Sequence, residues 1–135
     1  MTDQLKKILI VEDDDLITQM YQASLASSHF QVQMEKDGES GWKTVQSFMP
    51  DLVILDFMMP KLNGVEVLQK IRADERLKSI PVIVMSSLSA EADKKRALDA
   101  GATAYWVKNE VNMVEFEQKI NEVLSQNTNN IPAQS

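Results

Sequence analysis

The chain has 135 residues, a hydrophobic content of 44% and a formal net charge of -6 at pH 7. A chain of this size and composition is expected to form one globular domain, and its excess of acidic groups disfavours binding to the phosphate backbone of nucleic acids. It contains no cysteine, which excludes disulfides, zinc sites built on thiolates and cysteine nucleophiles.

The amino-terminal segment shows no pattern of a targeting signal. Residues 1–7 lead directly into a strand-like run, with neither the apolar region of a signal peptide nor a stretch long enough to span a bilayer. The absence of cysteine is compatible with a reducing compartment. We therefore expect a soluble, cytoplasmic protein that does not associate with membranes.

Five short runs of apolar, branched residues recur along the chain and predict β-strands. They cover residues 8–11, 30–34, 52–55, 82–85 and 104–107. Amphipathic stretches of helical length separate them, and this βα alternation predicts an α/β fold with a five-stranded parallel, doubly wound sheet. Runs such as 52–55 and 82–85 are apolar at every position, which is typical of strands covered by helices on both faces.

Five helices are predicted between and after these strands. The second begins at Asp37-Gly38 and ends before Pro50, and the third follows Asn63-Gly64. Their apolar positions are Ile17, Met20, Tyr21 and Leu25 in the first helix, Trp42, Val45 and Met49 in the second, Val65, Leu68 and Ile71 in the third, and Met113, Phe116, Ile120, Val123 and Leu124 in the fifth. The fourth, residues 90–100, has only alanines and Leu98 to bury, so we expect it to be weakly anchored.

The end of the chain changes character after Leu124. Residues 125–130 are polar and lose the helical period. This pattern predicts a polar tail, or the beginning of a linker, over residues 126–135.

Charged and hydroxyl side chains follow the predicted strands where each one ends. Glu12 and Asp13 follow the first strand, Asp56 the third, Ser86 the fourth and Lys108 the fifth. In open α/β sheets, binding sites lie outside the carboxyl ends of the strands, so these groups should converge. Two carboxylates ~4 Å apart repel by about 4 kcal/mol at a surface-like dielectric, which a divalent cation would relieve. Carboxylates, a hydroxyl and a fixed cation around one acidic nucleophile fit phosphoryl transfer.

Four segments together resemble the receiver domain of bacterial two-component response regulators, of the single-domain, chemotaxis-regulator type. They are residues 10–14 (IVEDD), 55–60 (LDFMMP) with Asn63-Gly64, 81–87 (PVIVMSS), and 100–102 (AGA) through Tyr105 to Lys108. The resemblance covers about residues 7–124, so residues 1–125 are assigned to one receiver domain. It implies a flavodoxin-like fold with strand order 2-1-3-4-5.

The resemblance also implies a chemistry for the strand ends. Asp56 is expected to accept a phosphoryl group from the phosphohistidine of a histidine kinase or phosphotransfer protein. Mg²⁺, or Mn²⁺, would be held by Asp13 and Asp56, by the backbone carbonyl of Met58, and by Glu12 through a water. The domain would then catalyse only its own phosphorylation and dephosphorylation.

The same resemblance implies how the phosphorylated state is sensed. Lys108 and Ser86 would bind phosphoryl oxygens, and Ser86 and Tyr105 would act as the switch. The surface formed by residues 90–100, 104–107 and 113–124 would then change and control a downstream protein partner, the domain being a monomer or a phosphorylation-dependent dimer. As a hypothesis, the apolar side chains of Met58 and Leu88 hinder an attacking water and prolong the phosphorylated state.

One position departs from the family pattern, and several alternatives stay open. The family usually has a cis proline after the lysine, whereas here Lys108 precedes Asn109, so this loop is expected to be either trans or strained. Tyr105 could equally be a fixed aromatic residue of the core. The chain could be a complete regulator or the receiver domain of a longer protein.

Rival functions remain. A receiver-like adaptor would bind partners without phosphorylation. A magnesium-dependent phosphatase with an aspartyl intermediate would need a second carboxylate where Met58 stands. The four glycines form neither a dinucleotide fingerprint nor a P-loop, which argues against a nucleotide-binding module.

Overall fold

One sheet of five parallel strands forms the centre of the computed structural model, which describes residues 5–25, 29–57 and 63–133 and, for residues 127–133, only the backbone. Its order is β2-β1-β3-β4-β5, as the resemblance implied. The strands are β1 (Lys6–Val11), β2 (Phe30–Glu35), β3 (Leu52–Asp56), β4 (Val82–Ser86) and β5 (Ala104–Val107). The sequence prediction of five strands is therefore confirmed, with ends shifted by at most two residues.

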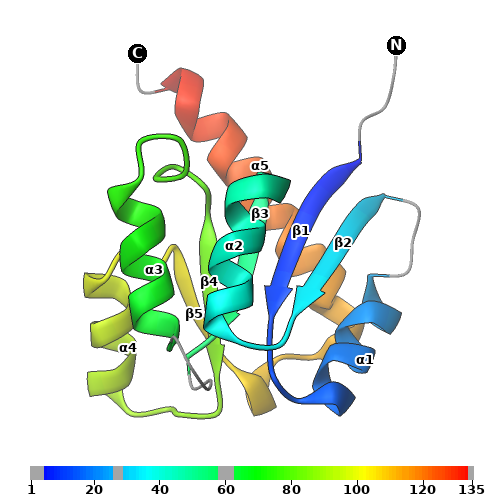
Figure 1. Ribbon diagram of the computed structural model, residues 1–135. Helices are drawn as coiled ribbons and strands as arrows, with labels where there is room; N and C mark the ends of the chain where they lie inside the picture. Colours follow the sequence, from blue (N-terminus) through cyan, green and yellow to red (C-terminus); the bar gives the residue numbers. More distant parts are fainter. Residues whose placement is uncertain (1–4, 26–28, 58–62, 134–135) are drawn as a thin grey trace.

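Five α-helices alternate with the strands (Figure 1). They are α1 (Asp15–Ser24), α2 (Gly38–Phe48), α3 (Gly64–Ala73), α4 (Glu91–Asp99) and α5 (Phe116–Ala133), with the short 3-10 turns η1 (Lys108–Glu110) and η2 (Met113–Glu115) before α5. The predicted start signals of α2 and α3 act as caps, because the side chains of Asp37 and Asn63 accept backbone N–H groups of the first turns. The side chain of Asp14 caps α1 in the same way.

Two apolar layers hold the helices on opposite faces of the sheet. On one face, α2, α3 and α4 cover alternate residues of the central strands, such as Leu9, Val53 and Val84. On the other face, α1 and α5 cover the intervening residues, such as Ile10 and Ile54. Every residue of β3 and β4 is buried, as expected for the fully apolar runs of a doubly wound fold.

The strand register brings the carboxyl ends of the strands to one edge. Val11 of β1 is paired with Leu55 of β3, and Asp56 is paired with Met85 of β4. Ser86 of β4 is paired with Val107 of β5. The residues that directly follow these strands therefore emerge side by side, although they are far apart in the sequence.

Two expectations about the helices were wrong. Leu98 of α4 is 50% exposed, and Ala97 is the residue of this helix that is buried. Met49 lies at the C-cap of α2 with φ 52° and is 38% exposed, rather than in the helix core. Beyond Leu124, α5 continues to Ala133, because extending a helix that has already nucleated needs no apolar burial. The assignment of residues 126–135 to a tail or the start of a linker stays a prediction.

None of the helices in the part of the chain that the structure describes is both long enough and apolar enough to cross a membrane.

Candidate functional site

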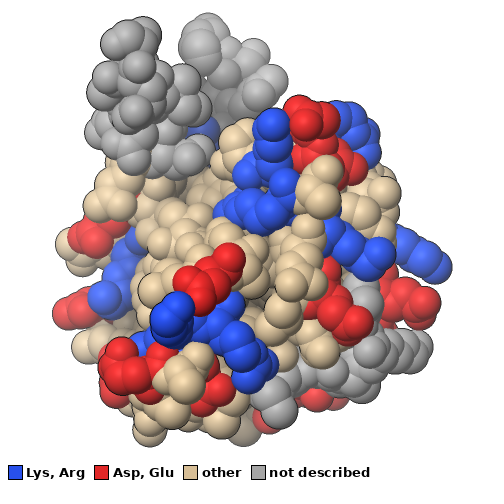
Figure 2. Space-filling view, turned by 90° about the vertical axis from the view of Figure 1, so that its left-hand side faces the viewer, with Lys and Arg blue, Asp and Glu red and all other residues tan. Residues whose placement is uncertain are grey.

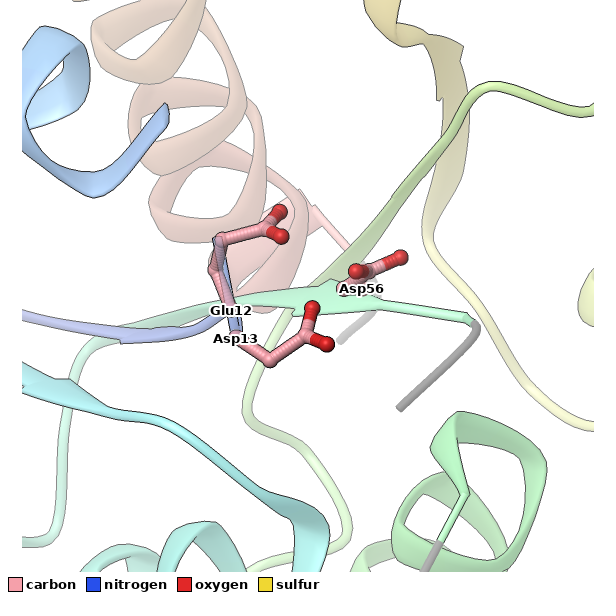
Figure 3. Close-up of side chains that lie close together, drawn as sticks. All are labelled: Glu12, Asp13 and Asp56. Carbon is pink, nitrogen blue, oxygen red and sulfur yellow. The ribbon is translucent and has the colours of Figure 1, made fainter. Parts of the chain in front are cut away.

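Three carboxylates meet at the carboxyl ends of β1 and β3. Ligand atoms of Glu12, Asp13 and Asp56 all lie within 4.8 Å of one another. Figure 3 shows Glu12 and Asp13 at the end of β1 with Asp56 beside them at the end of β3. Glu12 is 2% exposed and Asp56 is 5% exposed, whereas Asp13 is exposed. The convergence expected from the strand ends is therefore present, with one carboxylate open to solvent.

Lys108 supplies the only positive charge that forms ion pairs with this cluster among the described residues. Its ammonium lies 2.8 Å from a carboxylate oxygen of Glu12 and 3.3 Å from one of Asp56. The Lys108 side chain is 18% exposed. Among the described residues, three carboxylates face one ammonium, and a divalent cation would balance the remaining negative charge.

The pKa values of the buried groups reflect this crowding. Burial raises the pKa of Glu12 from 4.5 to about 7, against the lowering effect of the hydrogen bond from Lys108, and the neighbouring charge of Asp56 raises it further. Burial lowers the pKa of Lys108, but the hydrogen bond to Glu12 and the charges of both carboxylates outweigh it and leave that pKa above its usual value. The ammonium therefore stays charged at neutral pH.

A close approach of α3 positions the backbone beneath Asp56. A Cβ atom on Gly64 would lie 2.7 Å from the carbonyl oxygen of Asp56 and 2.8 Å from the Cα of Phe57. Only glycine fits there without moving the backbone, which explains the Asn63-Gly64 pair. Asn63 and Glu66 form a capping box that fixes the start of α3 against this point.

The loop after β4 is held through the backbone of Leu88, a half-buried residue. The hydroxyl of Ser86, which is fully buried, accepts a hydrogen bond from Leu88 N–H at 3.1 Å. The Tyr105 hydroxyl donates to the Leu88 carbonyl at 2.7 Å. The two residues expected to form the switch are therefore joined through one peptide segment of the β4–α4 connection.

The donor set fits a hard divalent cation. Two oxygens bound to one Mg²⁺ lie at most about 4.2 Å apart, because each is about 2.1 Å from the ion. The ligand atoms of the three carboxylates all lie within 4.8 Å of one another, which is close to the spacing that a shared ion requires. Met58, whose carbonyl is the expected further ligand, lies outside the described residues.

The Lys108–Asn109 connection is not cis. No cis peptide bond occurs among the described residues, and Lys108, Asn109 and Glu110 form the turn η1. Of the two alternatives left open by the missing proline, the trans form is the one present. Lys108 still reaches both carboxylates from this turn.

The basic residues of α4 do not form a uniform positive patch. Each is near an acid of the same helix: Lys94 with Glu91 at 3.6 Å, Lys95 with Asp99 at 2.8 Å and Arg96 with Asp93 at 3.7 Å. Figure 2 shows positive and negative side chains interspersed on this face of the molecule. The arrangement is typical of a solvated helix face.

Three side chains close to the site were not expected there from the sequence. Tyr21 was expected only as a core residue, but burial and then the charges of Glu12 and Asp56 raise the pKa of its hydroxyl. Phe57, next to Asp56, is 2% exposed and contacts the Arg96 guanidinium, whose carbon lies 5.1 Å from the ring centroid. The position of Phe57 after Asp56 was a usable signal, whereas nothing in the sequence distinguishes Arg96 from its basic neighbours.

Comparisons with known proteins agree with this geometry. The family model of the response regulator receiver domain matches residues 8–121. Protein RcaC of Microchaete diplosiphon is 36% identical over 124 residues, covering 92% of this chain and 19% of that protein. The chain spans less than half the length of the curated relatives it matches.

Two solved structures are similar over most of the chain. The Mn²⁺-bound form of response regulator Rcp1 matches with TM-score 0.70 and 29% identity, covering 76% of this chain and 81% of that one. The phosphorylated cyanobacterial phytochrome response regulator RcpA matches with TM-score 0.77 and 31% identity, covering 89% and 91%. By sequence, strand order and the residues at its strand ends, this chain belongs to the family of response regulator receiver domains of two-component systems.

Proposed function

We propose that Asp56 accepts a phosphoryl group from the phosphohistidine of a histidine kinase or phosphotransfer protein, and that this change controls a downstream protein. The observation that carries the proposal is the geometry around Lys108. Its ammonium is within 2.8 Å of Glu12 and 3.3 Å of Asp56, in a cluster with a third carboxylate, Asp13. A purely structural ion pair would not need this excess of carboxylates.

Each residue has a definite part in the transfer. A carboxylate oxygen of Asp56 forms the new P–O bond while the P–N bond of the phosphohistidine breaks. Asp13 and Asp56 would hold Mg²⁺ directly, Met58 through its carbonyl and Glu12 through a water; when bound, the ion neutralises charge on the transferred group. Lys108, already beside Asp56, exchanges its carboxylate partners for a phosphoryl oxygen.

The output follows from the loop after β4. Ser86 and Tyr105 both hold Leu88 in the unmodified protein. If the Ser86 hydroxyl turns to a phosphoryl oxygen, the Leu88 N–H loses its acceptor and the β4–α4 connection rearranges. The surface of α4, β5 and α5 then changes, and a protein partner reads it, with the domain acting as a monomer or a phosphorylation-dependent dimer.

The same interpretation assigns residues 1–125 to the receiver and residues 126–135 to a tail or the start of a linker, in a cytoplasmic protein. Mn²⁺ is an acceptable substitute for Mg²⁺, since carboxylate sites suit both ions. That a similar regulator, Rcp1, has been solved with Mn²⁺ supports this choice.

Intact mass after incubation with acetyl phosphate and Mg²⁺ tests the proposal. The wild type should gain one phosphoryl group, and the gain should disappear with EDTA or in Asp56→Asn. Asp99→Asn, an exposed aspartate on α4, is the matched control and should be modified like the wild type. A wild type that stays unmodified would favour the adaptor, and turnover of a diffusible phosphate ester would favour the phosphatase.

The lifetime of the phosphorylated state tests the role of Met58 and Leu88. Replacing both with polar residues should speed the loss of the phosphoryl group, because water then reaches it more easily. The measurement is the decay of the phosphorylated mass after the donor is removed. Unchanged or slower decay would contradict the proposed shielding.

A further inference from the structure

Helix α4 is attached to the rest of the molecule by few apolar contacts. Ala97 is its buried residue, while Leu98 is 50% exposed. Its N-cap, Ala90, makes no side-chain capping hydrogen bond. A helix with so little buried surface depends on individual side-chain contacts for its position.

One of these contacts leads directly to the residue after Asp56. The guanidinium carbon of Arg96 lies 5.1 Å from the centroid of the Phe57 ring, within the range of a cation–π interaction. The Phe57 side chain is 2% exposed, so its ring is fixed by packing. The Arg96 guanidinium also lies 3.7 Å from a carboxylate oxygen of Asp93 on the same helix.

The same ring also contacts the residue that holds the loop before α4. Tyr105 meets Phe57 edge to face, with centroids 6.2 Å apart and ring planes at 87°. The Tyr105 hydroxyl donates to the carbonyl of Leu88. Phe57 therefore joins Asp56, through the backbone, to both the body of α4 and the loop that leads into it.

We propose that Arg96 is a positioning residue: through the ring of Phe57 it holds α4 in the arrangement of the unmodified protein and so restrains phosphorylation of Asp56. This inference rests on the proposed function. A contact made only in the unmodified arrangement lowers the population of any competing arrangement by the same factor that the contact contributes. An exposed cation–π contact contributes a factor of about 2 to 5.

Five variants separate this role from a general effect on the helix. Arg96→Ala removes the cation, and Arg96→Lys keeps it near the ring. Lys95→Ala is the matched control, because it removes a neighbouring cation and its 2.8 Å pair with Asp99 without involving Phe57. Phe57→Leu, alone and combined with Arg96→Ala, removes the ring.

Two measurements are made on each variant of the full chain. The first is the initial rate of phosphorylation by acetyl phosphate with Mg²⁺, followed by intact mass. The second is hydrogen exchange of the α4 amides without any phosphodonor. We expect Arg96→Ala to be phosphorylated about 2 to 5 times faster than the wild type and to exchange faster in α4. Arg96→Lys and Lys95→Ala should stay near wild-type values, and Arg96→Ala should add nothing in the Phe57→Leu background.

The results distinguish failure of this inference from failure of the proposed function. A wild type that takes up no phosphoryl group overturns both. A wild type that is phosphorylated while Arg96→Ala matches it in rate overturns only the role of Arg96. The same holds if Lys95→Ala is accelerated equally, or if Arg96→Ala adds its full effect in the Phe57→Leu background.

Discussion

Replacing Glu12 by glutamine should stabilise the metal-free protein in a manner that depends on pH. Burial raises the pKa of Glu12 from 4.5 to about 7. Between these two pH values the folded protein keeps a proton that the unfolded chain has lost, so the free energy of unfolding falls as pH rises. A glutamine side chain at this position has no proton to lose, and the variant should not show this fall.

The size of the effect follows from the shift. One pKa unit corresponds to about 1.36 kcal/mol, so raising the pKa from 4.5 to about 7 disfavours the ionised carboxylate by roughly 3 kcal/mol. The free energy of unfolding of Glu12→Gln, relative to that of the wild type, should therefore increase by roughly this amount as the pH rises from 4.5 to above 7. Any loss of hydrogen bonding in the variant adds an offset that does not change with pH.

Urea denaturation in EDTA, followed by tryptophan fluorescence at several pH values, measures this difference. Glu122→Gln, an exposed glutamate on α5, is the control and should follow the wild-type curve. Adding Mg²⁺ should stabilise the wild type more than Glu12→Gln, since the ion supplies the missing positive charge. Parallel stability curves for wild type and Glu12→Gln across this pH range would refute the electrostatic reasoning.

Three further predictions concern the support of the site. Asp13→Asn should weaken Mg²⁺ binding at least about tenfold in calorimetric titration, because losing even a residue that only supports a metal ligand typically lowers metal affinity by about this factor. An unchanged affinity would show that Asp13 is not a ligand. Gly64→Ala should lower stability by about 1 to 3 kcal/mol, because its Cβ would lie 2.7 Å from the Asp56 carbonyl oxygen, and an unchanged urea midpoint would contradict that contact. Arg72→Met should lower the free energy of unfolding by at least about 2 kcal/mol, because the guanidinium donates a hydrogen bond to the carbonyl of Gly101 at 2.8 Å. Amide hydrogen exchange near β5 should also become faster, and wild-type protection there would contradict this role of Arg72.

The failures of sequence reasoning share a physical origin. Leu98 was expected to be buried because α4 offers few apolar residues, but the helix turns Ala97 to the sheet and is held partly by Arg96 on Phe57. Arg72 received no role, although its guanidinium donates to backbone carbonyls 8 and 29 residues away. Such contacts join residues distant in sequence, and a local pattern of apolar and polar positions does not contain them.

The sequence by itself determined the number and type of the main elements, the start signals of α2 and α3, and the set of chemical groups at the strand ends. These depend on local properties: continuous apolar runs, the helical period, and polar residues at each boundary. The strand order was inferred from resemblance to a family rather than from any local pattern.

Only the tertiary structure decided how these groups meet. The register of β1 on β3 and of β3 on β4 places Glu12 and Asp56 side by side, and the turn η1 brings Lys108 to both. Distances between side chains that are so far apart in the sequence are fixed by the packing of the whole sheet. The charge balance of the pocket, and the raised pKa of Glu12 within it, follow from that packing.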